Sequence, residues 1–153
     1  MNNKSVVLVN KKSEKIKFLV NTLIRKCKSE NIKVLAVSSS IEKTDMPEIL
    51  AKKTAEIAND FGISATCICF DNDGIKNKNE FSHAIEEASK NHELVLAAIP
   101  SIRIFADAII CAEKCDAAVL AEKYRYTHYK KYEKTLLFAK ENGIKILGTA
   151  ACK

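Results

Sequence analysis

Residues 33–48 read KVLAVSSSIEKTDMPE, and this stretch decides the fold class. It opens with the apolar run Val34 to Val37, which is typical of a short strand buried on both faces. Three serines follow, and Asp45 then marks the start of a helix. Glu48 stands three residues after Asp45, so the pair predicts a capping box, and Pro47 is tolerated in a first helical turn. A buried strand, a short loop and a helix form the repeating unit of an α/β protein.

The same alternation extends in both directions along the chain. Apolar runs predict strands over residues 6–9, 34–37, 64–70, 94–99, 117–121 and 144–147. Apolar residues at helical spacing predict helices that begin near residues 13, 45, 81, 104 and 129. Gly62 and Gly143 are placed to terminate two of them. The predicted fold is a three-layer α/β sandwich over residues 1–153, one domain, with a mostly parallel sheet of five or more strands and helices on both faces.

The composition agrees with a compact, ordered domain. Apolar residues make up 47% of the chain, with only four Gly and two Pro. No apolar run approaches the roughly 18 residues that a membrane-spanning helix needs, and the first residues lack a signal-peptide pattern, so we expect a cytoplasmic location. The six cysteines fall mostly inside predicted strands and helices, which favours reduced, buried thiols.

The charge is unevenly distributed. Residues 1–33 carry nine basic and two acidic side chains, residues 34–121 carry eight and fourteen, and residues 122–153 carry eight and three. Basic ends could mark a surface for nucleic acid, anionic lipid or an acidic partner. A lysine-rich solvated surface is the simpler interpretation, and nucleic-acid binding stays a less favoured alternative.

All four tyrosines lie between residues 124 and 132, among basic residues. Such a segment can stack on single-stranded nucleic acid, or Tyr124 and Tyr126 can be modified by phosphorylation. The favoured interpretation is that Tyr129 and Tyr132 belong to the buried stripe of the last helix, with their hydroxyls reaching solvent.

Ligands of parallel α/β sheets bind beyond the carboxyl ends of the strands, so the candidate site residues lie in those loops. The loop at 38–48 has no glycine and three acidic residues, with Lys43 as its one cation, so it does not match a phosphate cradle. Asp71 and Asp73 could hold Mg²⁺, although a simple Asx-turn is favoured. Arg103 is a possible anion contact. No catalytic triad and no metal-ligand set are visible.

The order of these elements resembles the cytoplasmic domain of bacterial tyrosine kinases of capsular and exopolysaccharide biosynthesis, a branch of the MinD/ParA-like P-loop proteins. Residues 13–19, SEKIKFL, are similar to the family's S-E-A-Y-R-x-L helix start, with Glu14 and Leu19 matching and Lys17 in the place of Arg. That helix takes part in ring oligomers in the family. Residues 70–73, FDND, resemble its second Walker motif, and residues 93–108 resemble its third.

The departures from the family pattern are as informative as the matches. The glycines, lysine and Ser/Thr of the Walker A loop are absent, and Ala98 stands where the family has its Walker B aspartate. Phosphoryl transfer depends on positioning and on charge stabilisation, so the loss of both elements predicts a protein without kinase activity. We expect no cofactor, and ATP with Mg²⁺ only if the degenerate site still binds them.

The resemblance therefore implies a regulatory or scaffold component of polysaccharide assembly. Its partners would be copies of itself or a related active kinase, and a membrane adaptor that holds it at the inner face of the membrane. A different class of function remains open: a ligand-binding or enzymatic α/β domain that uses the loop with Asp71 and Asp73. An open cleft at the strand ends would favour that alternative.

Overall fold

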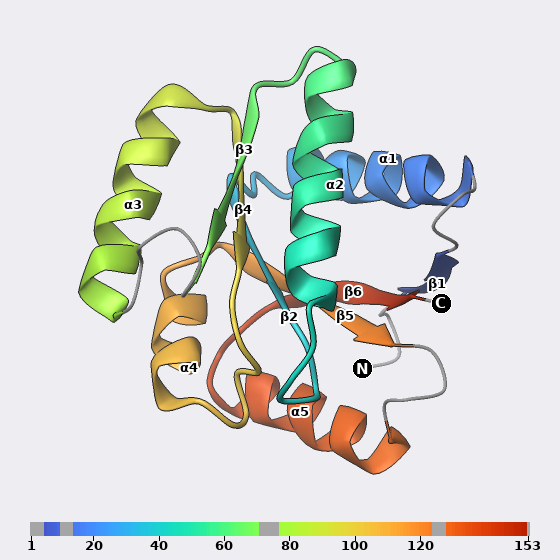
Figure 1. Cartoon of the computed structure of the whole chain (residues 1–153), viewed down its shortest axis with the longest axis vertical. Helices are drawn as coiled ribbons and strands as arrows, with labels where there is room; N and C mark the ends of the chain where they lie inside the picture. The colour runs from blue at the N-terminus through green and yellow to red at the C-terminus, as the bar shows by residue number, and fades with distance from the viewer. Residues whose placement is uncertain (1–4, 10–13, 71–76, 124–127, 153) are drawn as a thin grey trace.

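A computed structural model describes residues 5–9, 14–70, 77–123 and 128–152. Within these ranges six parallel strands form one sheet in the order β1-β6-β5-β2-β4-β3 (Figure 1). The strands are β1 (Ser5–Val9), β2 (Val34–Ser38), β3 (Ala65–Cys69), β4 (Leu94–Ala98), β5 (Ala117–Lys123) and β6 (Ile146–Cys152). The helices are α1 (Glu14–Ser29), α2 (Met46–Asp60), α3 (Lys78–Asn91), α4 (Ala106–Glu113) and α5 (Tyr129–Glu141).

The helices cover both faces of the sheet, because alternate strand residues point to opposite sides. Leu35 and Val37 of β2 pack in the core layer that α1 and α2 cover. Val34 and Ala36 of the same strand pack in the layer beneath α3, α4 and α5. Every residue of β2 and of β4 is buried. The predicted three-layer sandwich is therefore confirmed.

The sheet order brings together the ends of three strands that are separated in sequence. The central strand β2 lies between β4 and β5, and the register pairs Val37 with Ala98 and Ser38 with Leu120. The loops that leave β2 and β4 consequently meet at one edge of the sheet. This edge is the place where a ligand of a parallel α/β sheet is expected.

Two strand boundaries differ from the sequence-based prediction. The strand β5 runs on to Lys123, and β6 runs to Cys152, because the two continue to pair through Glu122 with Ala151 and Lys123 with Cys152. Glu122 and residues 148–150 therefore lie inside strands, whereas the sequence placed them in loops. The polar character of Glu122 had suggested that the strand ended before it.

The predicted capping box at the start of α2 is wrong. The backbone of Asp45 has φ −96° and ψ 3°, outside the extended region usual for an N-cap, and its side chain makes no cap hydrogen bond. Instead the backbone N–H of Met46 donates to Thr44 Oγ1 at 3.2 Å. Glu48 pairs with Lys52 at 2.6 Å, one turn along the helix.

The glycines predicted to end helices do so. Gly62 follows α2 with φ +83°, and Gly143 follows α5 with φ +72°. Both values lie in the left-handed region that glycine adopts without strain. No helix in the described ranges is long and apolar enough to cross a membrane.

Candidate functional site

The turn that follows β2 binds a carboxylate of the chain itself. Ser39 Oγ donates to Glu122 Oε1 at 2.9 Å, and Ser40 Oγ donates to Glu122 Oε2 at 2.6 Å. The backbone N–H of Ser40 lies 3.1 and 3.0 Å from the two carboxylate oxygens. Glu122 comes from the neighbouring strand β5 and is only 5% exposed.

These contacts explain how a carboxylate is tolerated in the core. A buried carboxylate is costly unless hydrogen-bond donors replace the water that it loses. Here one backbone amide and two hydroxyls supply that replacement, and the two serines are themselves buried. The turn after the central strand is thus an anion-binding turn whose anion is Glu122.

Sequence reasoning missed Glu122. Its one sequence signal is an acidic residue that follows the apolar run from Ala117 to Ala121. The partnership with the serines crosses more than eighty residues of chain, and no local pattern announces it.

The predicted anion contact Arg103 is used inside the protein. Its Nε donates to Thr135 Oγ1 of α5 at 3.3 Å, and its Nη2 donates to the backbone oxygen of Ser40 at 3.5 Å. The guanidinium therefore links α5 to the serine turn. The other predicted anion contact, Lys43, is exposed in the loop between β2 and α2.

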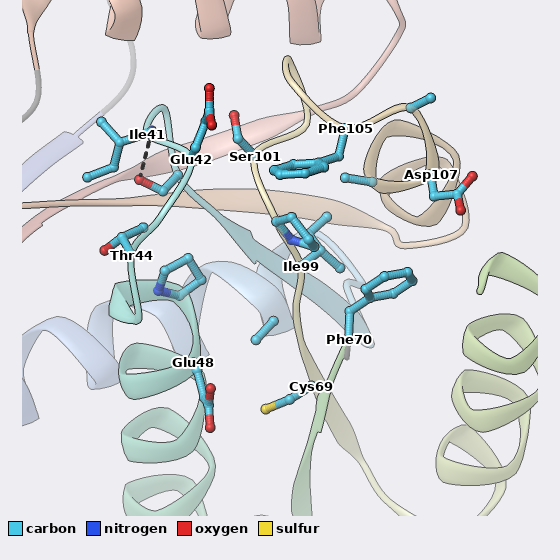
Figure 2. Close-up of a pocket in the computed structure, with 16 residues that line it drawn as sticks. Ile41, Glu42, Thr44, Glu48, Cys69, Phe70, Ile99, Ser101, Phe105 and Asp107 are labelled. Carbon is cyan, nitrogen blue, oxygen red and sulfur yellow. Dashed lines mark hydrogen bonds between the residues drawn. The ribbon is translucent and has the colours of Figure 1, made fainter. Parts of the chain in front are cut away.

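A pocket of about 660 Å³ opens beside the serine turn (Figure 2). It lies between the start of α2, the end of β3, and the segment that joins β4 to α4. In the part of the chain that the structure describes, carboxylates of Glu42, Glu48 and Asp107 line it, and no lysine, arginine or histidine does. Pro47 and Ile99 form part of its wall but do not fill it. The open cleft that would favour a ligand-binding domain is therefore present.

Polar and apolar surface line this pocket in about equal measure. Phe70, Ile99 and Phe105 face it in Figure 2, and Phe70 is held against Phe81 with ring centroids 6.2 Å apart. Ser101 also lines the pocket and is 2% exposed, and its Oγ has no hydrogen-bond partner among the described residues. Orphaned buried hydroxyls are uncommon in folded proteins.

Four of the predicted site residues lie outside the described residues: Asp71, Asp73, Tyr124 and Tyr126. Their predicted roles stay predictions. Within the described part of the chain, no three His, Cys, Asp or Glu side chains gather closely enough to hold a metal ion.

The residues predicted for the oligomer helix occupy different environments. Glu14 is the first residue of α1, and Lys17 is exposed. Leu19 is 4% exposed and packs in the core, so its side chain serves the fold. The exposed apolar residue of this helix is Phe18, whose side chain is 68% exposed.

The assignment of both tyrosines of α5 to a buried stripe is only half right. Tyr129 is 70% exposed. Tyr132 is half-buried, and its hydroxyl shares a 2.8 Å hydrogen bond with Thr149 Oγ1 of β6, so it does not reach solvent as predicted. Tyr129 is the first residue of α5 and lies six positions before Thr135, the first buried residue of the helix.

The prediction of reduced, buried thiols is confirmed for three cysteines, Cys27, Cys69 and Cys111. Cys67 and Cys115 are only half-buried. Burial raises the pKa of Cys27 and of Cys115 to about 12, with smaller contributions from nearby acidic groups. Such thiols are poor nucleophiles at neutral pH, since the thiolate is the reactive form.

No family model and no curated protein matches the chain. Solved structures do. The kinase domain of Escherichia coli tyrosine kinase ETK is 11% identical, with a TM-score of 0.77 over 92% of this chain and 76% of its own. The BceF tyrosine kinase domain is 10% identical, with a TM-score of 0.77 over 91% and 76%. The chimerical protein CapA2B2 is 11% identical, with a TM-score of 0.76 over 95% and 92%.

Identities this low speak for the fold alone. The matches cover more than nine-tenths of this chain, with TM-scores of 0.76 to 0.77. The chain therefore has the P-loop NTPase-like α/β fold of bacterial tyrosine kinase domains, as the sequence resemblance implied.

Proposed function

We propose that this chain is a non-catalytic relative of the polysaccharide-biosynthesis tyrosine kinases and acts as a regulatory or scaffold component of capsular or exopolysaccharide assembly. One observation carries the proposal: the turn after the central strand donates its hydrogen bonds to the carboxylate of Glu122. A nucleotide phosphate at this turn would have to displace a buried, fully engaged carboxylate.

The surrounding residues support the same conclusion. Glu42 and Glu48 line the adjoining pocket and would repel a triphosphate, while Lys43 is exposed in the loop. Ala98 ends β4 with an apolar side chain where a metal-positioning carboxylate would be needed. Phosphoryl transfer relies on charge stabilisation of a transferring group, and these residues oppose it.

A scaffold acts through its partners. The partners that we propose are copies of this chain or a related active kinase, together with a membrane adaptor that would bring the protein to the inner membrane face. The first helix presents Lys17 and Phe18 on its exposed side, which suits a contact with another subunit.

Calorimetric titration with ATP and Mg²⁺ tests the proposal. We expect no binding at micromolar concentration and no release of phosphate. Micromolar binding together with Mg²⁺-dependent phosphate release would overturn it. In a second arm, light scattering is used with a purified tyrosine kinase domain of polysaccharide biosynthesis. We expect it to detect a complex of that domain with this chain.

A second candidate function is that of a small-ligand-binding domain. The pocket beside the serine turn favours it, because a volume of about 660 Å³ falls in the usual range for sites of small molecules. This candidate is compatible with the first, since a scaffold without kinase activity can still be regulated by a ligand.

A further inference from the structure

We propose that the pocket beside the serine turn binds a small organic cation, a primary ammonium attached to an apolar body. This inference rests on the second candidate function, ligand binding, and is independent of whether the chain has lost kinase activity. Three features of the pocket carry it: the sign of its charge, an orphaned hydroxyl, and the aromatic and aliphatic side chains in its lining.

The charge of the lining excludes anions and attracts cations. Among the described residues, Glu42, Glu48 and Asp107 line the pocket, and no basic side chain does. Glu48 already pairs with Lys52 at 2.6 Å, so Glu42 and Asp107 supply most of the negative field. Both are exposed, so they would meet an ammonium that retains part of its hydration.

The hydroxyl of Ser101 is an independent sign of a missing ligand. It is buried and lines the pocket, yet its Oγ has no hydrogen-bond partner in the described part of the chain. In the view of Figure 2 it stands between Glu42 and Phe105. An unpaired buried hydroxyl destabilises the folded state, and an N–H donor from a ligand would satisfy its lone pairs.

The aromatic and aliphatic side chains in the lining indicate an organic ligand rather than a metal ion. Phe70, Phe105, Ile99 and Pro47 offer ring and aliphatic surface to the body of a ligand. The described residues also contain no group of three metal-ligating side chains. Aromatic rings attract a nearby cation through their faces, so the rings and the carboxylates favour the same kind of ligand.

Three probes that share one phenyl ring test the charge of the ligand. They are 2-phenylethylamine, 2-phenylethanol and 3-phenylpropionate, which are cationic, neutral and anionic at pH 7. We expect the amine to bind about tenfold more tightly than the alcohol, with the carboxylate weakest. Equal affinity for all three would overturn the proposal, and so would the absence of amine binding at millimolar concentration. Neither result would bear on ATP binding, so the two proposals can fail separately.

Variants of pocket residues identify which side chains contribute to the affinity for 2-phenylethylamine. The double variant Glu42→Gln with Asp107→Asn should weaken 2-phenylethylamine binding about tenfold. The control Glu56→Gln changes an exposed carboxylate of α2 that pairs with Lys53 outside the pocket, and it should leave affinity unchanged. An equal loss in both would indicate a general charge effect and contradict the site.

Ser101→Ala tests the hydrogen bond between the ligand and Ser101 separately from the attraction of the ligand to the carboxylates. It should weaken binding of 2-phenylethylamine about fivefold but leave its trimethylammonium analogue, which has no N–H donor, unaffected. The ligand-free variant should also melt at a higher temperature than the wild type, because the orphaned hydroxyl is gone. Equal effects on both amines would show that Ser101 does not contact the ammonium.

Discussion

Glu122 illustrates how a single residue can differ from what its neighbours in sequence suggest. It follows five apolar residues in β5 and is nearly fully buried. Its oxygens accept hydrogen bonds from Ser39 and Ser40, so the carboxylate is held by fixed donors rather than by water. Because charged partners strengthen hydrogen bonds, this cluster should contribute to stability as well as close the turn.

Glu122→Gln should destabilise the fold by about 1.5 to 3 kcal/mol, because an amide removes the charge and turns an NH₂ group toward serine donors. Urea unfolding measures the difference. The control is Glu87→Gln, an exposed residue of α3 that lies 3.5 Å from Lys90 and should change stability by less than about 0.5 kcal/mol. Equal effects of the two substitutions would show that the serine contacts contribute nothing specific.

Tyr132→Phe should lower the free energy of unfolding by about 1 kcal/mol. The substitution removes the hydrogen bond to Thr149 and leaves the buried Thr149 hydroxyl without that partner. Tyr129→Phe is the matched control, because Tyr129 is 70% exposed and its hydroxyl can bond to water. Thermal unfolding of the two variants should therefore differ. If Tyr129→Phe is the more destabilising of the two, the assignment of the buried partner is wrong.

The thiol of Cys27 should make stability depend on alkaline pH. Burial raises its pKa from the ordinary value of 9.0 to about 12, while the unfolded chain ionises near the ordinary value. Stability is therefore fully present below pH 9 and falls as pH rises toward 12, by up to about 1.4 kcal/mol per pH unit. Unfolding free energies of wild type and Cys27→Ala should converge between pH 8 and 10.5. Parallel curves of unfolding free energy against pH for the two proteins would contradict the raised pKa of Cys27.

At the scale of elements, α2 begins through a different residue from the one its sequence suggests. Both Thr44 and Asp45 are common capping residues, and a Glu three positions after Asp45 favoured the latter. The backbone of Asp45 does not take up the extended capping conformation, and the Thr44 hydroxyl receives the Met46 amide instead. The choice depends on how the loop leaves the serine turn, which is a tertiary matter.

Thr44→Val should destabilise the protein by about 1 kcal/mol, because the amide of Met46 loses its acceptor. Asp45→Asn, which keeps the size of a side chain that makes no cap bond, should have an effect below about 0.5 kcal/mol. Denaturant unfolding compares the two. If Asp45→Asn is the more destabilising of the two substitutions, Asp45 is the cap after all.

At the scale of the whole molecule, the sheet order decides which chain segments share a site. Placing β2 between β4 and β5 brings the serine turn, Glu122 and the pocket loop to one edge. The same topology places α1 on the opposite face from α5, so exposed apolar residues of these helices lie on different sides of the protein (Figure 1).

If α1 mediates self-association, Phe18→Ser should lower the mean mass in sedimentation velocity toward that of one chain. Phe18 is 68% exposed, and removing an exposed aromatic anchor weakens an interface without opening a cavity in the core. Leu137→Ser, which changes a 56% exposed residue of α5, is the control and should leave the mass unchanged. Equal shifts in mass for the two variants would mean that the self-association contact does not depend on Phe18. A wild type that stays monomeric would exclude self-association through α1.

The sequence by itself determined the architecture. Strands such as residues 34–37 are apolar throughout, a pattern that is required only in a sheet covered on both faces. The helices show one apolar stripe each. It also located the strand-end loops and showed that the loop at 38–48 contains no glycine. These are properties of neighbouring residues, so local periodicity and composition reveal them.

The tertiary structure alone decided what fills the turn after β2 and what lines the pocket. Glu122 and Ser40 are 82 positions apart, and Arg103 and Thr135 are 32 apart. The Ser101 hydroxyl lacks a partner among the described residues, which no sequence pattern shows. Such relations depend on strand order, on register and on how far β5 pairs with β6. A side chain's partner across a sheet is set by packing, and no pattern along one segment encodes it.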